Sequence, residues 1–206
     1  MKIFFDTSTH NLHLWEKEFN WEFGQFRTPL TQYKSGTFEW VLDNGCYTNW
    51  QPEKFHRMMI AAVNDPDCLW IVVPDIVANS EETLERFHAY TTHTPDILKK
   101  AAFVAQDGCG LDDVPWNQIK CLFIGGTDSF KDGVAAYRLA LEAKRRNKWV
   151  HIGRVNGTAR LVKWFRIADS IDGSGISKYR HMREKIVNDL KALHQYHQST
   201  LDDWSC

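Results

Sequence analysis

Several features that mark common classes of protein are missing from this chain. No apolar run approaches the roughly 18 residues of a membrane span. The N-terminus, MKIFFDTSTH, lacks the long apolar stretch and small-residue cleavage site of a secretory signal. The five cysteines are an odd number and form no CxxC pair. These absences predict a cytoplasmic protein with reduced thiols, neither secreted nor bound to a membrane.

Motifs of several catalytic and metal sites are missing as well. Nine histidines are present, but none stands in an HExxH or Cys/His zinc pattern. There is no GxSxG motif, and no cysteine lies in a recognisable nucleophile setting. The segment GGTDS lacks the Gly-Lys-Ser/Thr of a P-loop. We therefore expect no metal and no cofactor.

The composition is that of one globular domain spanning residues 1–206. Hydrophobic residues make up 43% and charged residues 25% of the chain, a balance that argues against disorder. The net charge of −1 hides an asymmetry, because residues 1–136 carry 11 basic and 19 acidic residues and residues 137–206 carry 14 and 7. The basic C-terminal third predicts contact with a polyanion, although solvated helix faces explain it equally well.

Short apolar runs alternate with amphipathic segments along the chain. The runs are apolar at consecutive positions, which is typical of parallel strands buried on both faces. They span 2–6, 38–45, 68–75, 102–108, 121–127, 149–155 and 168–175. The helix-like segments span 52–64, 80–92, 129–147, 159–167 and a basic stretch at 178–198. This order predicts an α/β fold, a small and possibly incomplete TIM-like (β/α)8 barrel, with a doubly wound open sheet as the alternative.

Polar side chains follow many of the predicted strands. They are Asp43, Asp75, Gln106 with Asp107, and Asp169 with Asp172. One aspartate after a strand is usually a turn or a helix cap. Several that converge at the carboxyl ends of barrel strands suit covalent chemistry at an acetal-like carbon, with one carboxylate as nucleophile and one as general acid/base. Gly125-Gly126 supplies N–H groups for a carbonyl oxygen, or simply makes a tight turn.

Taken in order, these strand ends resemble the tRNA-guanine transglycosylase family, most of all its short DNA-modifying relatives from phages and bacteria (the DpdA type). WVLDNGCYTNW resembles that family's strand ending in Asp-Ser-Gly-Gly-Phe-Gln, and CLWIVVPDIV its guanine-reading strand. AFVAQDG is similar to the Val-Gln-Gly strand, and CLFIGGTDSF to the Ile-Gly-Gly-Leu loop. VHIGRVNGTARLVKWFRIADSIDG resembles the stretch that leads to the nucleophilic aspartate. The likeness spans about residues 40–175.

The resemblance implies a role for each matching residue. Asp169 takes the place of the nucleophile, with Asp172 as a competing candidate, and Asp43 that of the acid/base. The base-binding residues would be Tyr47, Asp75, Gln106, Gly125 and Gly126. The implied reaction replaces guanine in DNA with a free 7-deazaguanine base such as preQ0, through a covalent glycosyl-aspartate.

The chain departs from the family at three points. Cys46 replaces the second glycine of the first motif, and the Pro-Thr-Arg that follows the family's nucleophile is absent. The family's C-terminal zinc subdomain has no counterpart either, which favours DNA over tRNA as the substrate. We expect the phosphate contacts to come from Lys144, Arg145, Arg146, Lys178, Arg180 and Arg183. The basic C-terminal helix is equally suited to pairing two copies as a homodimer.

Other functions remain open at this stage. A hydrolytic N-glycosylase or a nucleoside deoxyribosyltransferase would use the same pair of carboxylates. A tRNA-acting transglycosylase would keep the chemistry and change the polymer. A non-catalytic nucleic-acid-binding protein is the remaining alternative.

Overall fold

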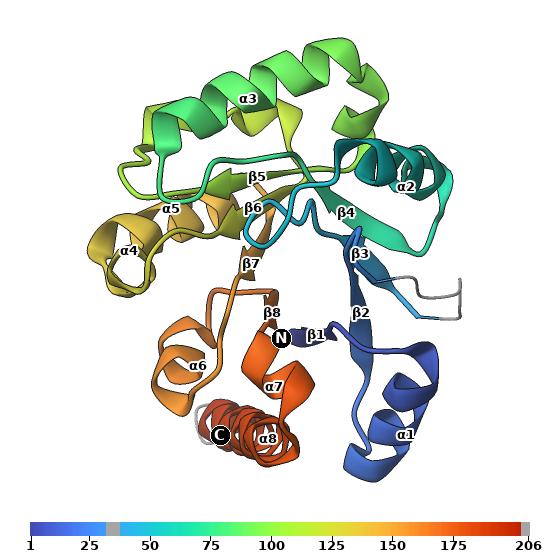
Figure 1. Cartoon of the computed structure of the whole chain (residues 1–206). Helices are drawn as coiled ribbons and strands as arrows, with labels where there is room; N and C mark the ends of the chain where they lie inside the picture. The colour runs from blue at the N-terminus through green and yellow to red at the C-terminus, as the bar shows by residue number, and fades with distance from the viewer. Residues whose placement is uncertain (32–37, 203–206) are drawn as a thin grey trace.

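The computed structural model describes residues 1–31 and 38–202, in which eight parallel strands close into a barrel (Figure 1). The strand order follows the chain order from β1 to β8, and β1 pairs with both β2 and β8. The predicted (β/α)8 barrel is therefore confirmed, and it is complete. A doubly wound open sheet is excluded because none of the described strands is left at an edge.

Each strand is short. The strands are β1 (Lys2–Phe5), β2 (Phe23–Arg27), β3 (Trp40–Leu42), β4 (Cys68–Val72), β5 (Ala101–Ala105), β6 (Cys121–Ile124), β7 (Trp149–Ile152) and β8 (Ser170–Asp172). The α-helices are α1 (Thr9–Phe19), α2 (Pro52–Asn64), α3 (Ser80–His93), α4 (Asp128–Asp132), α5 (Val134–Arg145), α6 (Thr158–Trp164), α7 (Ser174–Lys178) and α8 (Arg180–Asp202), and the 3₁₀ turns are η1 (Pro95–Lys99), η2 (Leu111–Asp113) and η3 (Trp116–Gln118).

Strand β2 was not predicted, because polar residues interrupt its apolar pattern. Phe26 points into the barrel, where its ring stacks near that of His151. Gln25 and Arg27 alternate with Phe26 on the other face of the sheet, yet both are buried. The Arg27 guanidinium lies 4.0 Å from the centre of the Trp40 ring and donates to Gln25 Oε1. A search for consecutive apolar residues cannot detect a strand built in this way.

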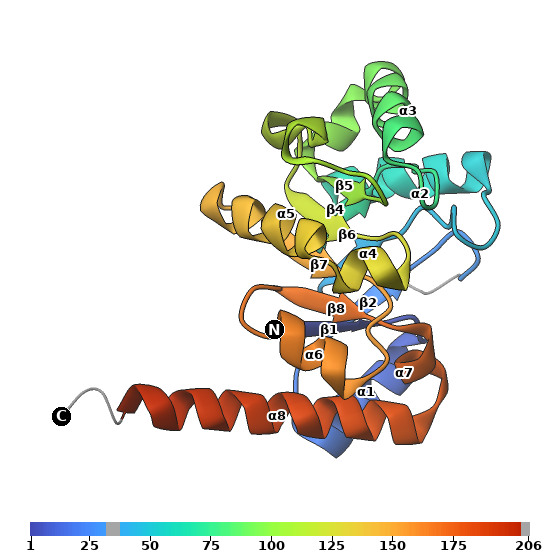
Figure 2. The same cartoon turned by 90° about the vertical axis from the view of Figure 1, so that its left-hand side faces the viewer.

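The predicted helix at 129–147 is divided into α4 and α5. Gly133 has an extended backbone (φ −82°, ψ 166°) and stands at the N-terminus of α5. The predicted C-terminal helix is α8, which lies alongside α6 and α7 on the outside of the barrel (Figure 2). Its buried apolar side chains are Ile186, Val187 and Leu190. No helix in the described part of the chain is both long and apolar enough to cross a membrane.

The cysteines that the structure describes are all free thiols. Cys68, Cys109 and Cys121 are buried, and Cys46 is half-buried near the barrel mouth. Burial raises the pKa of the Cys46 thiol to about 12, so this residue is not an activated nucleophile at neutral pH. Cys206 lies outside the described residues.

Aromatic rings fill the inside of the barrel. Phe4 from β1 and Phe123 from β6 both meet the Trp70 ring edge-on, with centroids 6.0 and 6.1 Å away. Gly24 of β2 makes room for this layer, since a Cβ atom there would lie 2.2 Å from the Phe4 ring. Edge-to-face contacts of this kind add about 0.5–1.5 kcal/mol beyond simple burial. The inside of the barrel is therefore a packed, apolar layer.

The Gly24→Ala variant tests this packing. The added methyl group must displace the buried Phe4 ring, so we expect the free energy of unfolding to fall by about 1–3 kcal/mol. A Cβ atom at Gly157 would meet no atom within 4 Å, so Gly157→Ala is the matched control. Urea denaturation measures both variants, and equal losses of stability would contradict the packing of Phe4 against Gly24.

Candidate active site

A pocket of about 260 Å³ opens at the carboxyl ends of the strands. This volume lies just below the range of about 300–1,000 Å³ that is typical of small-molecule sites. Its floor is apolar and contains Phe26, Val72, Val104 and Phe123. Its walls include the side chains of Asp6, Asp43, Asn44, Tyr47, Asp75, Gln106, Arg154 and Asp172, together with Gly125 and Gly126. The structure thus brings seven of the predicted site residues into one pocket: Asp43, Tyr47, Asp75, Gln106, Gly125, Gly126 and Asp172.

Asp75 is held by two amide side chains. Asn44 Nδ2 donates to one carboxylate oxygen at 2.8 Å, and Gln106 Nε2 donates to the other at 2.5 Å. Gln106 is fixed in turn, because its Oε1 accepts from the backbone N–H of Ala78 at 2.9 Å. Burial raises the pKa of Asp75, and the two amide hydrogen bonds oppose this effect. Asp75 and Gln106 therefore form a rigid polar pair that faces the pocket.

Asp43 has fewer hydrogen bonds and more charged neighbours. Its Oδ2 accepts from the backbone N–H of Gly45 at 3.0 Å. Burial, together with the negative charges of Asp75, Asp172 and Asp6, raises the pKa of Asp43 to about 7. A carboxyl group with this pKa can both release and accept a proton at neutral pH, as a general acid/base must.

Asp172 ends strand β8 and has one occupied and one open carboxylate oxygen. Its Oδ1 accepts from the backbone N–H of Arg154 and from Nε2 of His151, each at 3.1 Å. No hydrogen bond from a described residue reaches Oδ2. Gly153, next to Arg154, makes room for the Phe123 ring, because a Cβ atom there would lie 2.6 Å from that ring. Asp172 is therefore the carboxylate of β8 that the pocket presents to a ligand.

Asp169 lies at the opposite end of the barrel, so its predicted position at the mouth is wrong. It directly precedes β8, and its two carboxylate oxygens accept from Lys144 Nζ at 2.6 Å and from the backbone N–H of Val150 at 2.8 Å. It shares an open depression with Lys2 and Trp149, the first residues of β1 and β7. Ser170 and Ile171 of β8 separate Asp169 from Asp172, the pocket residue of that strand.

The predicted base-binding glycines have different roles. The N–H of Gly125 donates to the Ala105 carbonyl at 3.0 Å and so extends the sheet. A Cβ atom at Gly125 would lie 2.6 Å from Val104 and 3.2 Å from Gln106 Nε2, so glycine leaves room for the Gln106 amide. Gly126 has a φ of +72°, a conformation that favours glycine. Among the described residues, none accepts a hydrogen bond from the N–H of Gly126, so Gly126 is the glycine of the pair with an N–H group for a ligand.

Three of the predicted phosphate-binding residues lie far from the pocket. Lys144, Arg145 and Arg146 are at the C-terminal end of α5, and Lys144 pairs with Asp169 at the opposite end of the barrel. Arg145 and Arg146 both pair with Glu142, at 2.7 and 2.6 Å. Their position gives them no contact with a ligand in the pocket.

The other three predicted phosphate-binding residues surround the start of α8. Arg183 is buried, and its guanidinium lies 3.5 Å from the centre of the Trp15 ring. Arg180 pairs with Glu18 and Glu184 on the surface. Lys178 directly follows Ser177, which lines the pocket. Of the six predicted cations, Lys178 alone neighbours a pocket residue in the chain.

Arg154 is a cation at the pocket rim that the sequence analysis did not select. Its Nη2 donates to the Gly126 carbonyl at 2.5 Å, and its guanidinium lies 4.5 Å from the centre of the exposed Tyr47 ring. Its φ of +58° is unusual for a residue other than glycine. This conformation directs the backbone N–H of Arg154 to Asp172. Arg154 therefore contacts the Asp172 carboxylate, the Gly126 carbonyl and the Tyr47 ring.

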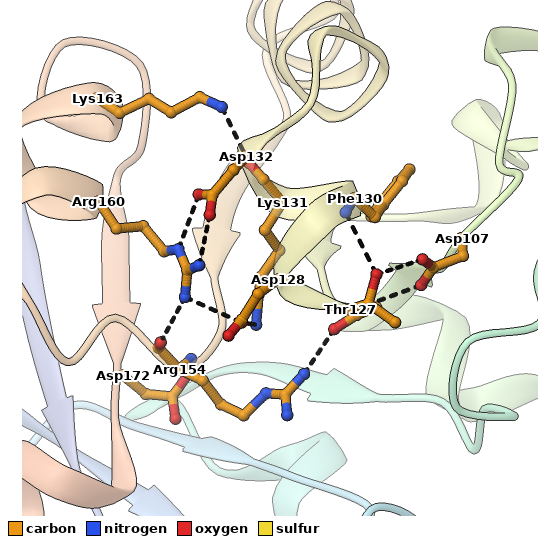
Figure 3. Close-up of polar contacts among 11 residues, drawn as sticks. Asp107, Thr127, Asp128, Phe130, Lys131, Asp132, Arg154, Arg160, Lys163 and Asp172 are labelled. Carbon is orange, nitrogen blue, oxygen red and sulfur yellow. Dashed lines mark hydrogen bonds and ion pairs between the residues drawn. The ribbon is translucent and has the colours of Figure 1, made fainter.

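A network of charges holds the loop that carries Arg154 (Figure 3). Arg160 of α6 pairs with Asp132 and Asp128 of α4, at 2.7 and 3.1 Å, and also donates to the Arg154 carbonyl. Asp107, predicted beside Gln106 at a strand end, accepts from the N–H and hydroxyl of Thr127 instead of entering the pocket. These contacts fix the loops around the pocket.

Comparisons of the chain with known protein families, curated proteins and solved structures returned no match. Within residues 1–31 and 38–202, no three His, Cys, Asp or Glu side chains gather in a way that could hold a metal ion. The polar groups that the pocket offers a ligand include its carboxylates and the amides of Asn44 and Gln106.

The raised pKa of Asp43 predicts a pH-dependent stability. Its ordinary value is 3.8, so between about pH 4 and pH 7 the folded protein binds a proton that the unfolded chain has released. As the pH rises from about 4 to about 7, the contribution of Asp43 to the free energy of unfolding should therefore fall. Above about pH 7 this contribution should stay constant. Asp43→Asn removes this contribution, so urea denaturation at pH 5 and pH 8 should show a smaller difference for the variant than for the wild type. Equal differences would contradict the raised pKa.

Proposed function

We propose that this pocket exchanges one nucleobase for another on a nucleic acid, with Asp172 as the nucleophile and Asp43 as the general acid/base. One observation carries the proposal: an anchored carboxylate with an open oxygen and a second carboxyl group with a pKa of about 7 line the same small pocket. The Asp75–Gln106 pair beside them is suited to reading a base edge. The resemblance to guanine transglycosylases supports DNA as the polymer and guanine and a 7-deazaguanine as the two bases.

The reaction proceeds in two displacements. Asp172 Oδ2 attacks C1′ of the target nucleotide, the bond from C1′ to N9 of guanine breaks, and a glycosyl ester of Asp172 forms. Protonated Asp43 gives its proton to the departing guanine. The entering base then gives its N9 proton to Asp43, attacks C1′ and displaces Asp172. The polymer gains one base and loses one, and both carboxyl groups return to their initial states.

Asp75 and Gly126 explain how one pocket can accept two bases. A carboxylate accepts hydrogen bonds, so Asp75 suits the N–H groups on the pyrimidine edge of guanine. The Gly126 N–H suits the carbonyl oxygen on the same edge. A 7-deazaguanine differs from guanine in its five-membered ring and keeps this edge, so both bases make the same contacts.

The target base must leave the helix to reach this pocket. Extruding a base from a duplex costs a few kcal/mol, which stacking on an aromatic ring can partly offset. Tyr47 lies exposed at the rim with Arg154 against its ring, where an extruded nucleotide would pass. Arg154 therefore replaces Lys144, Arg145 and Arg146 as the proposed contact to the sugar-phosphate.

Two carboxylates at opposite ends of one strand provide a matched test of the nucleophile. Asp172→Asn should lower incorporation of labelled guanine or preQ0 into DNA by at least about a thousandfold, because the amide cannot attack C1′. Asp169→Asn should retain the activity, because its contacts lie at the other end of the barrel.

The same assay separates the alternative functions. Incorporation of label into tRNA alone would mean that tRNA, and not DNA, is the polymer substrate. Release of guanine without incorporation of the labelled base would indicate a hydrolytic N-glycosylase. Loss of incorporation in Asp169→Asn with activity kept in Asp172→Asn would overturn the assignment of the nucleophile.

A second matched pair tests the nucleic-acid contact. Arg154→Ala should weaken binding of single-stranded DNA and lower the slope of log K against log salt by about one, as expected for one lost phosphate contact. Lys144→Ala removes a charge of the same sign from the opposite end of the barrel and should change neither quantity. Fluorescence anisotropy at several salt concentrations measures both variants, and a larger effect for Lys144→Ala would contradict the assignment.

A further inference from the structure

A buried histidine lies directly beneath the proposed nucleophile. His151, the third residue of β7, has no solvent-exposed surface. Its ring lies among aromatic rings of the barrel interior, with centroid distances of 4.9 Å to Trp70 and 4.6 Å to Phe123. Burying an imidazole among apolar rings is costly unless both nitrogens are hydrogen-bonded. The partners of these nitrogens therefore explain how the residue is tolerated there.

Both nitrogens of His151 have partners on β8. Nδ1 lies 2.8 Å from the Ser170 hydroxyl, and Nε2 lies 3.1 Å from Asp172 Oδ1. The Ser170 hydroxyl also accepts from Trp149 Nε1 at 2.7 Å. A chain of hydrogen bonds thus runs through the barrel interior from Trp149 to the carboxylate at its mouth.

The chemistry of these groups fixes the direction of the last hydrogen bond. The indole N–H of Trp149 can only donate, so the Ser170 hydroxyl oxygen accepts from it. The Ser170 hydroxyl proton is then available to Nδ1 of His151. Asp172, as a carboxylate, can only accept, so Nε2 of His151 must carry a hydrogen. His151 therefore donates to Asp172 Oδ1.

We infer that His151 is a positioning residue that orients Asp172 for attack. His151 donates to Oδ1 from inside the barrel, while the Arg154 N–H donates to the same oxygen from the loop after β7. Two donors from different elements stop the carboxylate from rotating and leave Oδ2 for the substrate. This role rests on the proposed function, because it matters only if Asp172 is the nucleophile.

Two substitutions of His151 separate orientation from packing. His151→Phe keeps a ring of similar size and removes both hydrogen bonds, whereas His151→Gln keeps an amide N–H near the position of Nε2 and loses the ring. We expect His151→Phe to lower kcat about 10- to 100-fold, as for other misplaced reacting groups, with the KM for the entering base unchanged. His151→Gln should regain most of that loss although it packs less well.

The readouts are the single-turnover rate of glycosyl-Asp172 formation, the KM for the entering base and the midpoint of thermal unfolding. A purely structural role predicts that activity follows the unfolding midpoint, so that His151→Gln is the more impaired variant. Recovery of the rate in His151→Gln despite a lower unfolding midpoint would instead support orientation of Asp172.

The remaining outcomes distinguish failure of the positioning role from failure of the proposed function. If the wild type exchanges bases, Asp172→Asn is inactive and folded His151→Phe keeps the wild-type rate, the positioning role fails and the proposed function stands. Equal losses of rate in the two His151 variants would also overturn the positioning role. A folded wild type that exchanges no base in DNA or tRNA overturns the proposed function and the positioning role together.

Discussion

The pairing of β8 with β1 is the interaction on which the site depends. In this register Lys2 lies opposite Ser170 and Phe4 opposite Asp172, so the last strand enters the barrel at Asp169 and leaves it at Asp172. Closure therefore gives two aspartates three residues apart entirely different surroundings. Asp169 becomes part of an ion pair at the amino end, and Asp172 meets Asp43 and Asp75 at the carboxyl end. An open sheet would leave Asp172 at an edge, without these neighbours.

Three of the carboxylates in the pocket differ in the donors that each receives. Asp75 accepts from two amide side chains, Asp172 from a histidine and a backbone N–H, and Asp43 from one backbone N–H. Burial, together with the negative charges of Asp75, Asp172 and Asp6, raises the pKa of Asp43 to about 7. Different environments for neighbouring carboxyl groups are how enzymes divide the work of nucleophile and acid/base.

Local sequence patterns predicted most of the strands and several of the pocket residues. Seven strands coincide with consecutive apolar runs, and site residues predicted at five of those strand ends line one pocket. Strand β2 was missed because Gln25 and Arg27 are buried through contacts with each other and with Trp40, which no local pattern reveals. Asp169 and Asp172 could not be told apart without the strand boundary, and the burial of His151 depends on rings from other strands. Lys144, Arg145 and Arg146 were predicted to bind phosphate from the basic charge of the C-terminal third. That charge does not show which end of a helix lies near the pocket.

The central claim is that Asp172 forms a covalent bond with the sugar, and capture of that intermediate tests it most directly. Incubating the protein with guanine-containing DNA in the absence of an entering base, followed by denaturation, proteolysis and mass spectrometry, locates the modified residue. We expect a sugar-linked adduct on the peptide that contains Asp172, absent from the Asp172→Asn variant. An adduct on Asp43 or Asp169, or base exchange that proceeds with no covalent adduct, would contradict the account.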